Sequence, residues 1–283
     1  MGEIPSGKIM DLFPEELEGM LSARKEGAYE IIDVRQPQEY TKGHIPGAKL
    51  IPLGEIEERM DEFSPDQDLL FYCRSGARSM AAASLVRDTG VSFRGIYNLV
   101  GGYGGYEGTG LVGMPRMDTI DLNLSLHQII VRAIDMEKGA WRFYTLFLER
   151  FPDAGFTPRL HRLVELEKKH GNALYTYWEK HVQPGPEQDF ESLFASLDGE
   201  ILEGGESLDD WTKRLENMQT ITCLDLAEAA LVIEYSAYDL YRNLADRVTG
   251  SAEITFFRLL SEQEKGHVRM VSKVFEDCYQ EDA

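Results

Sequence analysis

Six acidic and imidazole residues between positions 137 and 267 of this 283-residue chain form one pattern, present twice. Each copy is a glutamate followed 30 positions later (167 − 137 and 264 − 234) by Glu-x-x-His: Glu137, Glu167 and His170, then Glu234, Glu264 and His267. The second copy lies 97 positions after the first (234 − 137 and 267 − 170). Isolated Glu-x-x-His pairs also occur on solvated helix surfaces, but chance does not explain a shared register. The pattern therefore favours one composite site, with ligands suited to divalent metal ions.

The six residues fall where apolar side chains are expected. At helical spacing around them the chain carries Ile130, Ala133, Ala140 and Tyr144; Leu160, Leu163, Leu174 and Tyr177; Ala227, Ala230, Ala237 and Tyr241; and Phe257, Leu260, Val271 and Val274. Because residues three and four apart share one helix face, each acid lies on a face that should be buried. Four buried carboxylates would repel and lose hydration at a cost of roughly several kcal/mol each. Two divalent cations, with four positive charges, would balance them.

Four-helix bundles in which two helices each supply a Glu and the other two each supply a Glu-x-x-His bind a pair of metal ions in their core. From about residue 120 to 279 the chain accordingly resembles the rubrerythrin and ferritin-like di-iron carboxylate proteins. The resemblance implies an all-α four-helix bundle, with helices near 123–151, 157–182, 222–247 and 251–279 and a long crossover connection between the second and third. It also implies two iron ions as cofactor, with manganese as the alternative, since oxygen ligands with two imidazoles suit these ions better than structural zinc.

The chain departs from rubrerythrins in two respects. Three residues after Glu234, where those proteins carry a further glutamate, stands Ala237, and no Cys-x-x-Cys pair is present for a rubredoxin-like electron-transfer module. Peroxide reduction would therefore lack its usual route of electron entry, and an external electron donor is one possible partner. Tyr144 and Tyr241 each follow a predicted ligand by seven positions (144 − 137 and 241 − 234). They could orient a ligand carboxylate or simply pack in the core.

The first part of the chain alternates apolar strands with helical stretches. Residues 29–34 and 68–72 are expected to be buried strands, and 79–88 a helix. This alternation predicts an α/β domain with a mostly parallel sheet flanked by helices. The second strand is followed by Cys73-Arg74-Ser75-Gly76-Ala77-Arg78-Ser79. A cysteine that enters a helix, with two arginines nearby, has its thiolate stabilised and can act as a nucleophile toward sulfur.

With Asp33-Val34-Arg35, Glu39-Tyr40, Gly43-His44-Ile45-Pro46-Gly47-Ala48 and Asn98-Leu99-Val100-Gly101-Gly102, this loop resembles that of a single rhodanese domain. The resemblance implies that Cys73 accepts sulfane sulfur as a persulfide. It makes Arg74 and Arg78 anion-binding groups. The backbone amides of the loop would cradle the outer sulfur, among them those of Ser75, Gly76, Ala77 and Ser79. The resemblance implies a structural rather than a catalytic role for Asp33, Arg35 and Glu39. Tyr103 and Tyr106 stand where rhodaneses commonly carry a Trp, which leaves substrate choice open.

Three other residues have chemical potential without a clear assignment. His44 could act as a base but is better explained as part of its turn. Cys223 and Cys278 lie toward the same end of two antiparallel helices, 11 residues before Glu234 (234 − 223) and 14 after Glu264 (278 − 264). We expect two inert buried thiols, with a redox pair as the alternative interpretation.

We expect a multidomain chain: a rhodanese-like sulfurtransferase domain at 1–113, a linker at 114–121 and a ferritin-like bundle at 122–283. The net charge of −20 argues against nucleic acid and anionic membranes as partners. Neither a signal peptide nor a membrane-length apolar span is evident, and three scattered cysteines form no extracellular disulfide framework. These features favour a cytoplasmic enzyme, and bundles of this kind suggest a homodimer.

Two functions fit these patterns. In the first, Cys73 takes sulfur from thiosulfate, a persulfide or a polysulfide, while a di-iron centre reduces peroxide or dioxygen or oxidises a sulfur species. In the second, the bundle binds iron and the rhodanese domain delivers sulfur, for storage or iron–sulfur assembly, without oxidase or peroxidase turnover.

Overall fold

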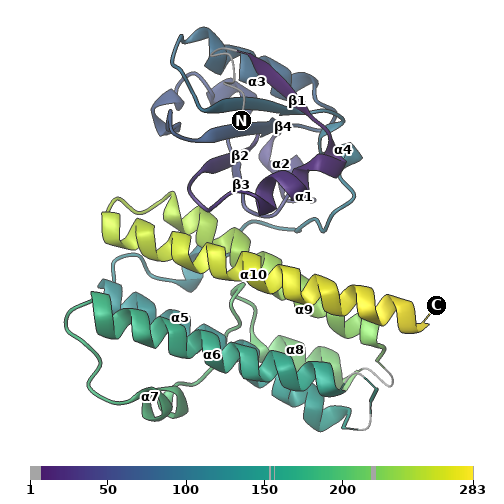
Figure 1. Ribbon diagram of the computed structural model, residues 1–283, viewed down its shortest axis with the longest axis vertical. Helices are drawn as coiled ribbons and strands as arrows, with labels where there is room; N and C mark the ends of the chain where they lie inside the picture. Colours follow the sequence, from purple (N-terminus) through teal and green to yellow (C-terminus); the bar gives the residue numbers. More distant parts are fainter. Residues whose placement is uncertain (1–7, 153, 156, 218–220, 283) are drawn as a thin grey trace. The chain divides into compact units, whose positions relative to one another are not determined.

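The computed structural model describes residues 8–152, 154–155, 157–217 and 221–282, which divide into two compact units (Figure 1). The first unit comprises the chain up to Pro115 together with residues 238–247 and 255–265. The second comprises residues 116–237, 248–254 and the chain from Gly266 onward. Helices α9 (Cys223–Ala245) and α10 (Ser251–Asp282) therefore contribute to both units.

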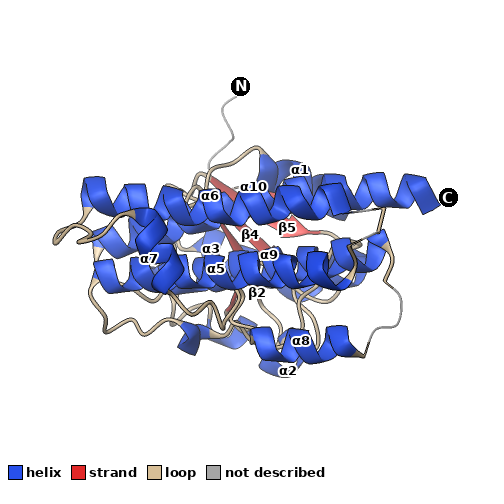
Figure 2. Cartoon of the chain, turned by 90° about the horizontal axis from the view of Figure 1, so that it is seen from below, coloured by secondary structure: helices blue, strands red, loops and turns tan. Residues whose placement is uncertain are grey.

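The first unit is built on a five-stranded parallel sheet in the order β1-β5-β4-β2-β3. Its strands are β1 (Ile9–Leu12), β2 (Tyr29–Asp33), β3 (Ala48–Leu50), β4 (Asp68–Tyr72) and β5 (Gly95–Leu99). In the part of the chain that the structure describes, all named strands belong to this sheet, drawn red in Figure 2. The strands expected at 29–34 and 68–72 are confirmed.

Both faces of the sheet are covered, as a parallel sheet requires. Successive strand residues point to opposite faces, so Ile31, Leu70 and Tyr72 enter one apolar core, while Ile32, Leu69 and Phe71 enter the other. The strands are flanked by α1 (Pro14–Ser22), α2 (Pro37–Tyr40), α3 (Ala77–Asp88) and α4 (Gly102–Gly105), with 3₁₀ turns η1 (Leu53–Glu55) and η2 (Met60–Glu62). The carboxyl ends of β2, β4 and β5 meet at one edge, where parallel sheets place their chemistry.

The second unit is all-helical apart from one isolated bridge between Ile201 and Ser207, within the residues described. It contains α5 (Leu126–Arg150), α6 (Thr157–His181), α7 (Phe190–Ser196), α8 (Leu208–Glu216), the first part of α9 and the two ends of α10, preceded by the 3₁₀ turn η3 (Met117–Thr119). The four long helices end within three residues of the expected limits. The long connection between the second and third carries α7 and α8.

One apolar core unites this unit. Helices α5, α6, α8, α9 and α10 all contribute buried side chains to it: Ala140, Phe143, Tyr144, Phe147, Leu160, Leu163, Leu208, Trp211, Leu226, Ala230, Ile233 and Val271. Leu202, in the connection between α7 and α8, belongs to the same core. A disulfide between Cys223 and Cys278, with Cα atoms 5.4 Å apart, joins the first residue of α9 to α10. The pairing interpretation of these two cysteines is the one that the structure supports.

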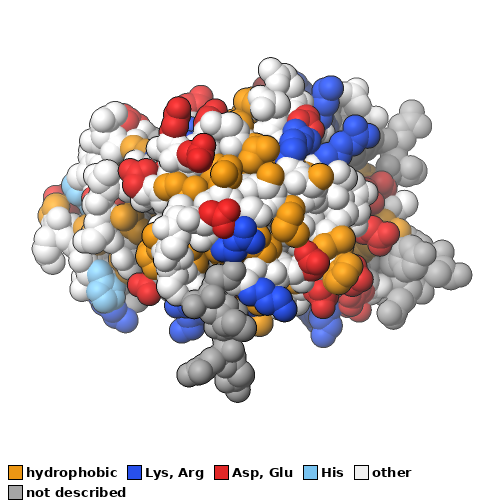
Figure 3. Space-filling model, turned by 90° about the horizontal axis from the view of Figure 1, so that it is seen from above, with side chains coloured by type: hydrophobic (Ala, Val, Ile, Leu, Met, Phe, Trp, Pro, Cys, Tyr) orange, Lys and Arg blue, Asp and Glu red, His pale blue; other side chains and the backbone are white. Residues whose placement is uncertain are grey.

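On the face shown in Figure 3, acidic, basic and apolar side chains are interspersed. Among the described residues, no helix combines the length and the apolar character needed to cross a membrane.

Candidate active site and candidate metal centre

Cys73 follows the last residue of β4 and lies at the start of a loop that leads into α3. Of the chain's three cysteines it is the free one, and it is buried. The Gly76 amide donates a hydrogen bond to its Sγ at 3.1 Å. Arg74, Ser75 and Ala77 are exposed, so the outer face of the loop meets solvent.

A second loop fixes the backbone of the first. The amides of Tyr103 and Gly104 donate to the carbonyl oxygens of Cys73 and Arg74, at 2.8 and 2.9 Å. Gly102 makes this approach possible: its φ of +56° is left-handed, and a Cβ there would overlap the Cys73 carbonyl oxygen. The Gly-Gly segment singled out in the sequence thus holds the cysteine loop in place.

The environment of Cys73 favours its thiolate. Burial acts to raise the pKa of the thiol, but hydrogen bonds from the Ser79 hydroxyl and from the amides of Ser75, Ser79 and Gly76 outweigh it, and the pKa is lowered. The Ser79 hydroxyl lies 3.5 Å from Sγ and 2.6 Å from the Asn98 side-chain oxygen. The Gly76 carbonyl oxygen is a third acceptor, at 3.1 Å, so the single hydroxyl proton is within reach of the sulfur and of two oxygens. Three of the four predicted amide donors therefore point at the sulfur; for Ala77 the structure shows only a position at the start of α3.

Arg78 is held by an acid. Both of its terminal nitrogens contact Glu39, each at 2.7 Å. The hydrogen bond from Arg78 lowers the pKa of Glu39 to about 2, and Glu39 in turn raises the pKa of Arg78. Arg74, by contrast, is exposed. The sequence predicted a structural role for Glu39, and the structure shows that Glu39 contacts Arg78, at the start of α3 directly after the cysteine loop.

Asp33 and Arg35 form the architectural pair that the sequence predicted. The Asp33 carboxylate accepts from Arg35 at 2.6 to 3.0 Å, and Arg35 also donates to the Gly43 carbonyl at 2.7 Å. His44 is buried, stacks on Tyr40 with ring centroids 3.8 Å apart, and places Nε2 3.2 Å from Asp239. Such enclosure fits its interpretation as a turn residue.

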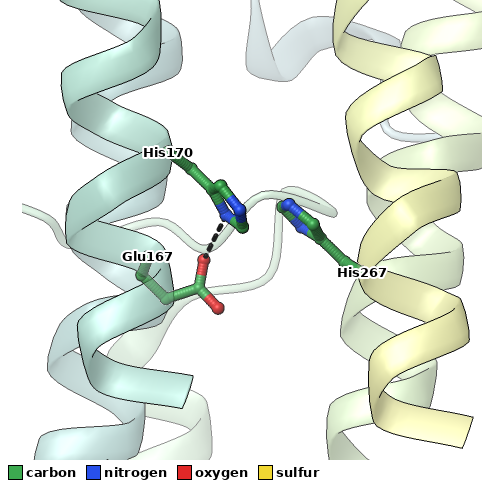
Figure 4. A group of neighbouring side chains, drawn as sticks. All are labelled: Glu167, His170 and His267. Carbon is green, nitrogen blue, oxygen red and sulfur yellow. Dashed lines mark ion pairs between the residues drawn. The ribbon is translucent and has the colours of Figure 1, made fainter. Parts of the chain in front are cut away.

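In the second unit the predicted acids and imidazoles converge. Glu137 on α5, Glu167 on α6 and Glu234 on α9 are fully buried, and His170 and His267 lie between helices α6 and α10. His170 Nδ1 is 3.6 Å from Glu167 and 3.8 Å from Glu137, and His267 Nδ1 is 3.1 Å from Glu234. Figure 4 shows the two rings pointing toward one another from opposite helices. Their centroids are 3.6 Å apart, and burial followed by the neighbouring His267 lowers the pKa of His170 to about 3.

Glu264 lies one turn before His267 on α10, and its side chain is completely buried. Tyr144 is buried in the core of the second unit, and its hydroxyl donates to Glu234 at 3.3 Å. Tyr241 is also completely buried. Its assignment beside the metals stays a prediction.

Glu203 is the residue that sequence reasoning missed. It lies between α7 and α8, is fully buried, and has a carboxylate oxygen within 4.8 Å of ligand atoms of Glu137 and Glu167, and likewise of Glu234 and His267. Its spacing from the other acids matches no helical period. The one available signal in the sequence was the pair Gly204-Gly205, which directly follows Glu203 and predicts a turn. A predicted turn does not show which residues the Glu203 side chain contacts.

The donor set fits a pair of divalent ions. Glu167, His170 and His267 form one group of ligand atoms within 4.8 Å of one another, and Glu137, Glu167 and Glu203 form another. Carboxylate oxygens with imidazole nitrogens suit iron or manganese. Burying so many acids side by side is costly unless cations neutralise them.

Comparison with known proteins concerns the first unit. Residues 13–109 match the family described as Rhodanese-like domain. "Thiosulfate sulfurtransferase GlpE" of Pseudoalteromonas translucida is 35% identical over 77 residues, 27% of this chain and 71% of that protein. "Uncharacterized protein YqhL" of Bacillus subtilis is 42% identical over 74 residues, 26% of this chain and 57% of that protein.

A solved rhodanese-like domain protein from Staphylococcus aureus is 28% identical, covering 36% of this chain and 97% of that one with a TM-score of 0.33. The chain spans about half the length of the first curated relatives that it matches, 57% and 41%.

Proposed function

Because this chain belongs, through residues 13–109, to the rhodanese-like family, we propose that it is a sulfurtransferase that carries sulfane sulfur on Cys73. The observation that supports this most directly is the free Cys73 thiol, whose pKa is lowered by hydrogen bonds from the Ser79 hydroxyl and from the amides of Ser75, Ser79 and Gly76. Amides that point at a thiolate can also hold the outer sulfur of a persulfide.

The chemistry follows from this arrangement. The Cys73 thiolate attacks the outer sulfur of a donor such as thiosulfate, a sulfur–sulfur bond forms, the donor's own sulfur–sulfur bond breaks, and sulfite leaves with the electron pair. An acceptor nucleophile then takes the outer sulfur, and the thiolate is regenerated. Exposed Arg74 lies where it attracts an anionic donor, and Glu39 holds the second arginine, Arg78, beside the loop.

Steady-state transfer of sulfur from thiosulfate to cyanide tests this proposal. We expect thiocyanate production by the native protein and background production by Cys73→Ser. The double variant Cys223→Ser/Cys278→Ser serves as the control, because it removes the two cysteines of the disulfide in the second unit without freeing a thiol. Equal activity of the native protein and Cys73→Ser would refute the proposal.

For the second unit we propose a site for two iron or manganese ions in a ferritin-like four-helix arrangement. The observation that favours it is the convergence of Glu137, Glu167, Glu234 and two facing imidazoles in a buried core. Glu264, one turn before His267, completes the proposed set. The bound ions would supply redox chemistry toward peroxide, dioxygen or a sulfur species. Tyr144 would orient the Glu234 carboxylate, and the surrounding core would exclude water.

Elemental analysis of protein produced with ample iron, repeated on Glu167→Ala, tests the metal site. We expect about two ions per chain in the native protein and a clear loss in the variant, because Glu167 belongs to two of the donor groups. Metal-free native protein would refute the proposal.

Anaerobic loading with Fe(II) followed by peroxide separates a redox enzyme from an iron carrier. Rapid, repeated loss of peroxide with a reductant present supports turnover. A single round of ferric accumulation supports the alternative, in which the second unit stores iron and Cys73 delivers sulfur.

A further inference from the structure

A tight turn between α7 and α8 enters the donor cluster. The amide of Leu202 donates to the Glu206 carbonyl and that of Gly205 to the Leu202 carbonyl, both at 2.8 Å. The Leu208 amide donates to the Glu200 carbonyl at 2.8 Å and closes the base of the turn. Within this frame Leu202 is anchored in the apolar core, so the turn is fixed at both its base and its tip.

Two glycines let this turn approach two ligand-bearing helices. A Cβ at Gly139, two residues after Glu137 on α5, would overlap the Ile201 backbone oxygen. A Cβ at Gly204 would overlap the side chain of Ser236, two residues after Glu234 on α9. The turn therefore lies against α5 and α9 at the level of their glutamates.

Glu203, between those contacts, is completely buried. One of its carboxylate oxygens lies within 4.8 Å of ligand atoms of Glu137 and Glu167, and one lies within 4.8 Å of ligand atoms of Glu234 and His267. No other member of these groups comes from outside the long helices, among the residues described. A carboxylate has two oxygens and can bridge two ions.

We propose that Glu203 is a ligand shared by both metal ions, delivered by the connection rather than by a bundle helix. This inference rests on the metal site proposed above. It assigns the connection between α7 and α8 a role in building the site, and it explains why a fully buried acid stands in a turn whose other glutamates are exposed, as Glu200 is, or partly exposed, as Glu206 is.

Titration of metal-free protein with Co(II), followed by visible absorption, tests the assignment. We expect two ions per native chain. In Glu203→Gln we expect binding of at least one ion to weaken by about tenfold or more, with a changed visible band. Glu200→Gln is the matched control, because it removes an exposed acid from the same turn. We expect it to bind as the native protein does.

A backbone variant tests the positioning without removing any donor. Gly139→Ala should push the turn away from α5 and weaken Co(II) binding in the same direction as Glu203→Gln. Gly266→Ala is its control: this helical glycine adjoins His267, and no described atom outside its own helix lies within 4 Å of a Cβ built there. If Glu203→Gln does not fold, Glu203→Asp retains the charge but retracts it by one methylene, and we expect a similar loss of binding.

Thermal unfolding of the metal-free proteins distinguishes a ligand from a structural residue. Removing one of several crowded buried carboxylates should leave the melting temperature of Glu203→Gln unchanged or raise it. A residue needed only for the turn would lower it.

The two proposals fail separately. Native protein that binds two Co(II) ions while Glu203→Gln binds them with equal affinity and spectrum overturns the role of Glu203 and leaves the metal site standing. Native protein that binds no Co(II) overturns both.

Discussion

Glu39 and Arg78 form a two-pronged ion pair, with both terminal nitrogens of the arginine 2.7 Å from the carboxylate. Arg78 lies in the first turn of α3, directly after the cysteine loop, and Glu39 lies in α2, so the pair joins these two helices and neutralises one of the two positive charges near Cys73. The cysteine loop is thus less cationic than its sequence suggests.

Replacing Glu39 by Gln should strengthen binding of an anionic donor. Because Arg78 then keeps its full charge beside the loop, we expect KM for thiosulfate to fall by about two- to fivefold, the scale of a partly exposed ion pair. Glu55→Gln is the control, since Glu55 pairs with Arg59 on an exposed surface. An unchanged or higher KM in an otherwise active Glu39→Gln protein would contradict this view of the loop.

The ionisation of Cys73 should depend on Ser79. The folded protein lowers the pKa of the thiol, so its thiolate is present at pH values below those of an ordinary cysteine. Ser79→Ala should shift the midpoint of iodoacetamide alkylation upward, because it removes the hydroxyl donor. Ser75→Ala should not, because Ser75 acts through its amide. The contribution of this group to folding stability is present at high pH and is lost as the pH falls through the lowered pKa.

Substitutions at the adjacent Gly101 and Gly102 distinguish the effect of a strained backbone from the effect of displacing the cysteine loop. Gly101 and Gly102 both have positive φ, but a Cβ at Gly101 has no atom closer than 3.8 Å, whereas one at Gly102 overlaps the Cys73 carbonyl. Gly101→Ala should cost about 1–2 kcal/mol of unfolding free energy with sulfur transfer largely retained. We expect Gly102→Ala to cost more and to lose most of its sulfur transfer. Equal effects in urea unfolding and activity would show that the overlap is unimportant.

The Cys223–Cys278 disulfide should stabilise the helical unit. It closes a loop with a sequence separation of 55, for which chain entropy gives roughly 4 kcal/mol. Urea unfolding of Cys73→Ser protein with and without a reductant measures this contribution directly, since Cys223 and Cys278 are then the only cysteines on which the reductant acts. An unchanged unfolding free energy after proven reduction would remove the disulfide from the account of stability.

Local patterns were sufficient to predict much of this molecule. Strand alternation and the residues around Cys73 predicted the sheet and the position of Cys73 at its edge, and helical spacing predicted the four long helices and the burial of Glu137, Glu167 and Glu234. These features are set by residues close in sequence, where periodicity carries the information.

The remaining features depend on tertiary placement. The direction of Glu203 is decided by contacts at Gly139 and Ser236, far away in sequence. The Glu39–Arg78 pair and the turning of Ser79 toward Asn98 likewise require the loops to be placed in space. Sequence spacing predicted that Cys223 and Cys278 lie toward one end of their helices. Whether they form a disulfide or remain two thiols depends on the distance between them, which the sequence does not give.

Intact-mass spectrometry after treatment with thiosulfate tests the sulfur-carrier role of Cys73 most directly. We predict that the native protein gains the mass of one sulfur atom on the peptide that contains Cys73, that cyanide removes it, and that Cys73→Ser gains none. Native protein that acquires no sulfur, or Cys73→Ser protein that acquires as much, would contradict the account.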